Sequence, residues 1–188
     1  KYDNKAIFNP ISFEVNDKDR VAIVGKNGAG KSSILNLILG NDIKYDGNIK
    51  IANDLKISYV SQSTEGLTGT LKSILMNDDR GTLKSISTDD DVDESIFKAM
   101  LVKMGVSNKE FDKDIKQMSE GQKKKVLIAK SISQRANLYI WDEPLNYIDI
   151  LTRMQIEEAI LKYKPTLIFV EHDETFIKKI ATITVYLE

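Results

Sequence analysis

Short apolar runs along this chain alternate with segments whose apolar positions recur every three or four residues. The runs at 11–15, 20–24, 137–141 and 166–170 have the length and β-branched content of strands. A glycine cluster follows 20–24, and the apolar run 33–39 follows the cluster, so the order predicted here is strand, loop, helix. Strands that are apolar at nearly every position are typical of a parallel sheet covered on both faces. The pattern therefore predicts an α/β architecture with a mostly parallel sheet.

The middle of the chain has a helical pattern. Phe97, Met100, Leu101 and Met104 share one helix face and are expected to pack in the core. A turn signal at Asp46-Gly47 separates short β-prone pieces at 47–51 and 56–60. We expect one domain over residues 1–188. Its core is expected to comprise about 1–68 and 134–188 and to include an N-terminal antiparallel β part. A helical subdomain over about 69–133 is expected as an insert in this core.

The amino-acid composition argues against several classes of function for this chain. The 188 residues are 41% apolar, include no cysteine and carry a net charge of -1, so thiolate metal sites are excluded and no strong drive toward nucleic acid is expected. No apolar run approaches the roughly 20 residues that cross a bilayer, so direct membrane insertion is not expected. Two charged stretches are interpreted as solvated: the lysines at 123–125 as an exposed helix face, and the acidic stretch 87–94 as an exposed loop, with a cation site as its alternative.

The glycine cluster carries a phosphate-binding pattern. The letters GKNGAGKS, residues 25–32, fit G-x-x-x-x-G-K-[ST] between a strand and a helix, where backbone N–H groups can surround phosphate oxygens. Lys31 would reach the β- and γ-phosphates, and the Ser32 hydroxyl would ligate Mg²⁺. The alternative, a glycine-rich turn with a chance lysine, does not account for this position. The expected nucleotide-binding residues in and after the loop are Gly25, Asn27, Gly28, Ala29, Gly30, Lys31, Ser32 and Ser33.

Two adjacent acids follow the apolar run that ends at Trp141. Asp142 is expected to complete a Mg²⁺ site, since this cation takes oxygen ligands and retains waters. Glu143 would then orient or deprotonate the attacking water. Pro144 is expected to hold Glu143 in an extended conformation. Two solvated acids at the start of a loop are the alternative for this segment taken alone.

The chain's one histidine, His172, follows the apolar run 166–170 and lies 29 residues after Glu143. That distance leaves room for one helix and one strand, and a parallel β-α-β unit would bring both side chains to the same edge of the sheet. His172 is therefore expected to contact the γ-phosphate or the water, although a structural role is the usual one for a lone histidine.

These motifs together resemble the ATP-binding cassette family, whose fold is a P-loop NTPase (RecA-like) core. The resemblance identifies Walker A at Gly25–Ser32, the Q-loop glutamine Gln62, the signature MSEGQ at 118–122, Walker B ending at Asp142, the catalytic Glu143 and the switch histidine His172. It implies ATP and Mg²⁺ as ligands, with Ser32, Gln62 and Asp142 as ligands of the metal. It also implies that Tyr2 stacks on the adenine ring, with the nearby Phe8 as the alternative. It also implies that Ser119, Glu120, Gly121 and Gln122 serve the nucleotide of a partner cassette, and that Asn146 and Asp149 lie at the dimer interface.

Two departures from the common family pattern refine this resemblance. Glu120 stands where the signature usually has glycine, and Asn146-Tyr147 stands where transporters usually have Ser-Ala. The second departure resembles the corresponding loop of the ABC-F subfamily. These are cytoplasmic proteins with two cassettes that act on ribosomes and in some cases protect them from antibiotics. The letters MSEGQKKK and WDEPLNYID together resemble the second cassette of the resistance-type ABC-F proteins. The resemblance implies a second cassette, in the same polypeptide or a homodimer, and a ribosome reached through segments outside this chain. The alternatives are a transporter domain coupled to transmembrane subunits and a nucleotide-gated clamp with little hydrolysis.

Overall fold

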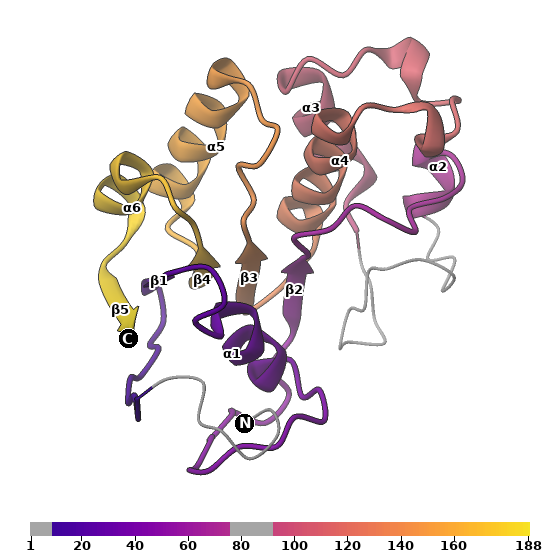
Figure 1. Cartoon of the computed structure of the whole chain (residues 1–188). Coiled ribbons are helices and arrows are strands. Elements are labelled where there is room, and N and C mark those ends of the chain that lie inside the picture. The colour runs from indigo at the N-terminus through magenta and orange to yellow at the C-terminus, as the bar shows by residue number, and fades with distance from the viewer. Residues whose placement is uncertain (1–8, 76–91) are drawn as a thin grey trace.

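Five strands form one parallel sheet in the computed structural model, which describes residues 9–75 and 92–188 (Figure 1). In chain order they are β1 (Arg20–Gly25), β2 (Ile57–Val60), β3 (Leu138–Asp142), β4 (Leu167–Val170) and β5 (Ile183–Leu187). Their order across the sheet is β2-β3-β4-β1-β5, and each neighbouring pair is parallel. The α/β prediction with a mostly parallel sheet is confirmed.

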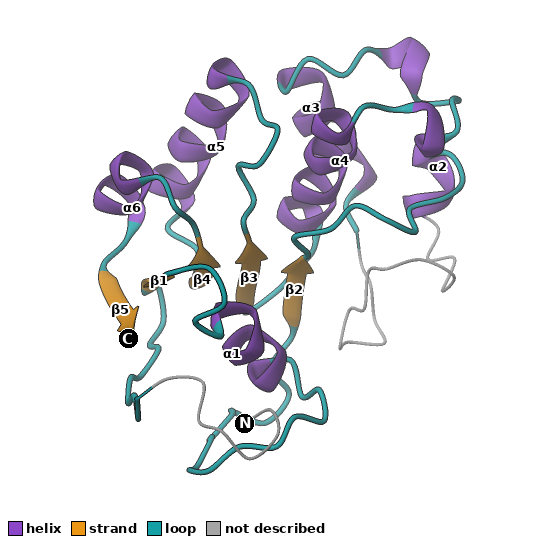
Figure 2. Cartoon of the chain, in the orientation of Figure 1, coloured by secondary structure: helices purple, strands orange, loops and turns teal. Residues whose placement is uncertain are grey.

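Helices connect the strands (Figure 2). They are α1 (Lys31–Ile38), α2 (Leu71–Leu75), α3 (Glu94–Lys103), α4 (Glu120–Ser133), α5 (Ile150–Tyr163) and α6 (Glu174–Ile180), with short 3-10 helices η1 (Asn108–Glu110) and η2 (Ile115–Gln117). Across the ranges that the structure describes, every helix is too short or too polar to cross a bilayer.

The two faces of the sheet bury different side chains because neighbouring strand residues point in opposite directions. Val21 and Ile23 pack with Ile34 and Leu35 of α1. Ala22 points to the other face, where a second hydrophobic cluster contains residues of α3, α4, α5 and α6. The signature helix α4 and the helix α1 that follows the phosphate loop therefore lie on opposite faces of the sheet.

The described elements between β2 and β3 are all helical, as expected of an insert. Phe97, Leu101 and Met104 are buried and Met100 packs against them, which confirms the core role of this stripe. They share one hydrophobic cluster with Val60 and Trp141 of the sheet. The division into a core and a helical subdomain stays a prediction.

An N-terminal antiparallel β part does not form within the residues that the structure describes. Neither 9–19 nor 41–56 contains a strand. The segment 11–15, predicted as a strand, has no ladder partner in the described chain, although Ile11, Phe13 and Val15 pack on the cluster around α1. Residues 46–54 are exposed, so burial does not hold them against a neighbouring strand.

Two predicted features fall wholly or mostly outside the described residues. Tyr2 and Phe8, the candidates for adenine stacking, lie in the N-terminal gap. Most of the acidic stretch 87–94 lies in the second gap. Of that stretch, Asp93 caps α3 by accepting the Ile96 N–H at 3.0 Å.

Candidate nucleotide and catalytic site

The carboxyl ends of three neighbouring strands bring the candidate residues together. Asp142 at the end of β3 pairs with Val170 of β4, and Val170 pairs with Ile23 of β1. Asp142 itself ends β3, and the loops that follow these strands hold the phosphate loop, Glu143 and His172. One edge of the sheet carries all three, and the prediction that Glu143 and His172 share this edge is confirmed.

The phosphate loop connects β1 directly to α1. Gly28 and Gly30 have φ values of 81° and 91°, in the left-handed region that favours glycine. Gly30 provides no side-chain cap for α1, so first-turn N–H groups remain available to an anion. Lys31 is buried, and its Nζ donates to the carbonyls of Gly25 at 2.9 Å and Lys26 at 3.1 Å. The loop has the backbone and the cation that a phosphate site needs.

Asp142 and Ser32 fit a Mg²⁺ ion. The Asp142 side chain is buried, and its Oδ1 has no hydrogen-bond partner among the described residues. Burial raises the pKa of Asp142, while the hydrogen bond from Ser32 opposes that shift. An unpaired buried carboxylate oxygen is costly, and a hard cation that takes oxygen ligands would satisfy it. These two residues would hold the metal.

Three side chains converge on the Glu143 carboxylate. Gln62 Nε2 and Asn146 Nδ2 donate to Oε2 at 2.9 Å and 2.7 Å, and His172 Nε2 lies 3.3 Å from Oε1. Glu143 is largely buried at 14% exposure, whereas His172 is half exposed at 49%. The structure thus places Gln62 on Glu143, and its role as a metal ligand stays a prediction. The arrangement fixes a carboxylate beside the metal position, which is the geometry that a water-activating base requires.

The backbone of Glu143 corrects one expectation. Its φ is 48°, in the left-handed region, and not in the extended conformation that Pro144 favours. The Glu143 N–H donates to the Val170 carbonyl at 3.0 Å, and the three side-chain contacts hold the carboxylate. Strained backbone of this kind persists where surrounding contacts impose it, as they do here.

Lys124 overturns the interpretation of the 123–125 run as a solvated face. Its side chain is completely buried, and Nζ donates to the carbonyls of Ser61 at 2.8 Å, Gln62 at 3.2 Å and Asp142 at 3.3 Å. Burial lowers the pKa of Lys124 to about 8, and the nearby carboxylates oppose that shift. This lysine joins the signature helix to the glutamine loop and to the end of β3. Its helical spacing of three and four from the buried Leu127 and Ile128 was the signal that could have revealed it.

The two flanking lysines are also engaged. Lys123 Nζ lies 2.8 Å from the Glu120 carboxylate, and Lys125 Nζ lies 2.6 Å from the Asp149 carboxylate. Lys125 also donates to the Met104 carbonyl at 2.7 Å. The run is therefore held at three separate places within the fold.

Glu171 is a second residue that the sequence reasoning missed. It follows β4 directly and is buried, and its carboxylate accepts the backbone N–H groups of Leu145 and His172. Burial raises its pKa, and the two N–H groups oppose the shift. An acid between an apolar strand and the switch histidine was the available signal.

The signature residues begin α4. Ser119 and Gln122 form a capping box, with Gln122 N donating to Ser119 Oγ at 3.2 Å and Ser119 N donating to Gln122 Oε1 at 3.0 Å. Glu120, at the unusual position, accepts a hydrogen bond from Thr64 and pairs with Lys123. Gly121 has no room for a side chain, since a Cβ there would lie 2.5 Å from the Tyr147 carbonyl oxygen. The signature thus packs against the loop after β3.

The loop from Asn146 to Asp149 ends at the cap of α5. Asp149 accepts the Thr152 N–H at 2.9 Å and pairs with Lys125, and these contacts lower its pKa. Tyr147 has a φ of 65° and is 76% exposed. The expected places of Asn146 and Asp149 at a dimer interface stay predictions.

Comparison with known proteins gives a consistent result. The profile of the family described as "ABC transporter" matches residues 8–146. ATP-binding protein Uup of Buchnera aphidicola (subsp. Acyrthosiphon pisum) is 34% identical over 95% of this chain and 29% of its own length. Ribosome protection protein VmlR of Bacillus subtilis is 28% identical over 95% of this chain and 31% of its own. The chain thus spans about a third or less of these curated relatives.

A solved structure agrees with this match. The archaeal ribosome recycling factor aABCE1, in complex with the ribosomal stalk protein aP1, has a TM-score of 0.72 and 26% identity over 93% of this chain and 32% of that chain.

Proposed function

Because the chain belongs to the ABC transporter family and carries that family's ATP-binding cassette, we propose that it hydrolyses Mg-ATP at a site completed by a second cassette and acts on the ribosome. The convergence of Gln62, Asn146 and His172 on Glu143, beside the buried Asp142, is the observation that carries the proposal. A cytoplasmic location follows from it.

The chain's own residues divide the chemical work. Bound Mg-ATP supplies the phosphoryl group that is transferred to water, with the metal offsetting negative charge. Gly28, Gly30 and Lys31 bind the phosphates, and Ser32 and Asp142 hold the metal. Glu143 orients the water and accepts its proton, and the contacts from Gln62, Asn146 and His172 hold that carboxylate in place.

The position of the signature supports a partner cassette. Ser119 is exposed at the start of α4, which lies on the opposite face of the sheet from α1. It is therefore free to meet another chain's nucleotide. Near the signature, four large apolar side chains are 58% to 76% exposed: Tyr147, Ile150, Leu151 and Met154. Exposed apolar groups gathered on one loop and one helix turn are typical of a protein contact.

The proposed action on the ribosome is supported by the ABC-F-like form of the loop at Asn146-Tyr147 and by the relatives of the chain. Asn146 of the ABC-F-like loop donates to Glu143, so the feature that distinguishes this loop from the transporter form contacts the catalytic carboxylate. The relatives include a ribosome protection protein and a protein named ABC transporter F family member 2 of Arabidopsis thaliana, 30% identical over 95% of this chain and 26% of its own length. Purified ribosomes are expected to raise ATP turnover by the whole polypeptide to which this cassette is proposed to belong.

Glu143→Gln tests the proposed chemistry. The substitution keeps the size of the side chain but removes the carboxylate that accepts the proton. We expect the Mg-ATP dissociation constant to change by less than about twofold and kcat to fall by about 100-fold or more. Binding is measured by calorimetry and turnover by phosphate release.

Glu158→Gln is the matched control, because this glutamate is 70% exposed on α5 and pairs with the surface Lys103 at 3.6 Å. It should leave both constants unchanged. Wild-type turnover in the Glu143→Gln variant would refute the role given to Glu143.

A further inference from the structure

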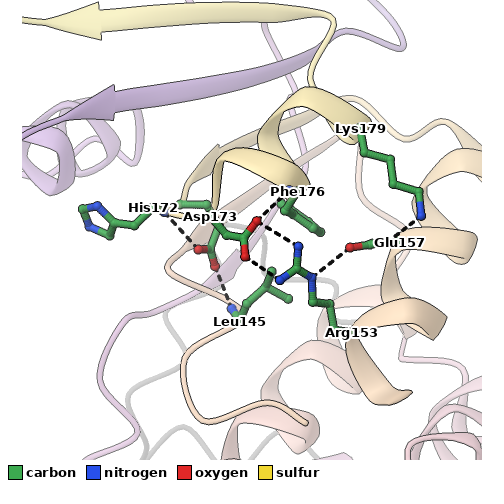
Figure 3. A network of polar contacts seen from close by, with 8 residues as sticks. Leu145, Arg153, Glu157, His172, Asp173, Phe176 and Lys179 are labelled. Carbon is green, nitrogen blue, oxygen red and sulfur yellow. Dashed lines mark hydrogen bonds and ion pairs between the residues drawn. The ribbon is translucent and has the colours of Figure 1, made fainter. Parts of the chain in front are cut away.

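A single buried carboxylate joins the two loops that carry Glu143 and His172. Glu171 Oε1 accepts the Leu145 N–H at 2.8 Å, and Oε2 accepts the His172 N–H at 3.1 Å. Leu145 lies in the loop after β3 and His172 in the loop after β4. Figure 3 shows the dashed contacts from Leu145 and His172 meeting at one carboxylate, with the His172 ring directed away from it.

A guanidinium group connects α5, which follows the first of these loops, to Asp173, which ends the second (Figure 3). Arg153 of α5 donates through both terminal nitrogens to Asp173, with Nη2 2.9 Å from Oδ1, and through Nε to Glu157 at 2.9 Å. Asp173 also accepts the Phe176 N–H at 2.9 Å and so caps α6. Helix α5 starts directly after the loop that contains Asn146, and Asp173 directly follows His172. The Arg153–Asp173 pair is therefore a second connection between the chain after β3 and the chain after β4, beside the one that Glu171 makes.

We propose that Glu171 and Arg153 are positioning residues that make the loop 143–149 and the loop 171–173 move as one unit. The pairing of His172 with Glu143 then depends on where the loop 143–149 lies. The exposed Tyr147 is the part of that loop that a second cassette can contact. A partner bound there would shift Leu145 and, through Glu171, His172. The effect on turnover rests on the proposed ATPase function, whereas the positioning of His172 does not.

The chemistry of position 171 requires a carboxylate. Two separate N–H groups point at its two oxygens, and a buried carboxylate is stable only when such donors compensate for lost water. A glutamine at this position keeps the shape but offers one carbonyl oxygen, so its amide NH₂ would face one of the two N–H groups. Glu171→Gln is therefore the sharpest variant, since it breaks one of the two connections without opening a cavity.

His172 provides a direct readout because it is the chain's only histidine. Protein expressed without a histidine tag and labelled with ¹⁵N-histidine gives one set of imidazole NMR signals. Glu143→Gln defines the signals of His172 without its carboxylate partner. We expect Glu171→Gln and Arg153→Gln to move the signals at least halfway from the wild-type position toward that reference.

Glu174→Gln is the control, since Glu174 follows Glu171 by three residues at the start of α6, but is 81% exposed and pairs with the surface Lys178 at 2.9 Å. The His172 imidazole signals of the Glu174→Gln variant should coincide with those of wild type. Emission of the sole tryptophan, Trp141, which is buried, verifies that each variant is folded. If Glu171→Gln does not fold, Arg153→Gln decides the question by the same signals.

The rate of ATP hydrolysis is the second measurement. In Glu171→Gln we expect an unchanged ATP dissociation constant and a kcat lowered about tenfold or more, because the base is misplaced while the phosphate loop is intact. Imidazole signals at the wild-type position in folded Glu171→Gln would overturn the proposal. Absence of ATP turnover in the wild type would instead refute the proposed function and leave the NMR result to decide the positioning.

Discussion

Lys124 is fully buried, and its ammonium group donates to the carbonyls of three residues, two in the loop after β2 and one at the end of β3. Lys124→Met retains the length of the side chain but removes the ammonium group that donates to those carbonyls. We expect the free energy of unfolding to fall by about 1–3 kcal/mol. Urea unfolding followed by Trp141 emission measures it.

Lys116→Met provides the comparison, because Lys116 is exposed in η2 and close in sequence. That variant should unfold within about 0.5 kcal/mol of wild type, as surface substitutions do. Equal unfolding midpoints for the two variants would show that the buried ammonium group contributes nothing to stability.

At the residue scale, the sequence predicted candidate residues that the structure brings together. The phosphate loop, Asp142, Glu143 and His172 lie at or just after the ends of strands, and the structure places them at one edge of the sheet. Their chemical roles stay predictions. Lys124 and Glu171 were not predicted because their burial depends on tertiary contacts with distant backbone carbonyls and N–H groups. The φ of Glu143 escaped prediction for the same reason, since distant contacts outweigh the local preference set by Pro144.

At the element scale, α6 depends on its cap. Arg153 and the Phe176 N–H lower the pKa of Asp173 from 3.8 to about 2. A carboxylate with a depressed pKa contributes stability that is present above its unfolded pKa and lost as pH falls through the folded value. We expect wild type to exceed Asp173→Asn in unfolding free energy by a constant amount above about pH 4, and that difference to vanish between about pH 4 and pH 2.

The Asp173 side chain is 37% exposed, so solvent screening keeps the difference small, at about 1 kcal/mol or less. Chemical unfolding at successive pH values, followed by Trp141 emission, measures it. A difference that stays constant down to pH 2 would contradict the assigned titration.

Element prediction succeeded where apolar periodicity was strong and failed where partners were needed. The stripe of Phe97, Leu101 and Met104 is buried as expected. The alternating segment 11–15 has the pattern of a strand, but pairs with none in the described chain. Alternation reports which side chains face inward, whereas a strand also requires a neighbour to accept its hydrogen bonds.

At the scale of the whole molecule, the two helices that begin at the proposed nucleotide-binding segments lie on opposite faces of the sheet. The phosphate loop leads into α1 on one face, while exposed Ser119 begins α4 on the other. If one chain's signature completes another chain's site, hydrolysis requires two cassettes to meet. The central claim is therefore a statement about association as well as chemistry.

The most direct test is the rate of ATP hydrolysis per chain, measured at saturating Mg-ATP over a wide range of protein concentration. The account predicts slow turnover at low concentration and a rate per chain that rises with concentration until pairing saturates. Fast turnover that is independent of concentration would contradict a site shared between two cassettes.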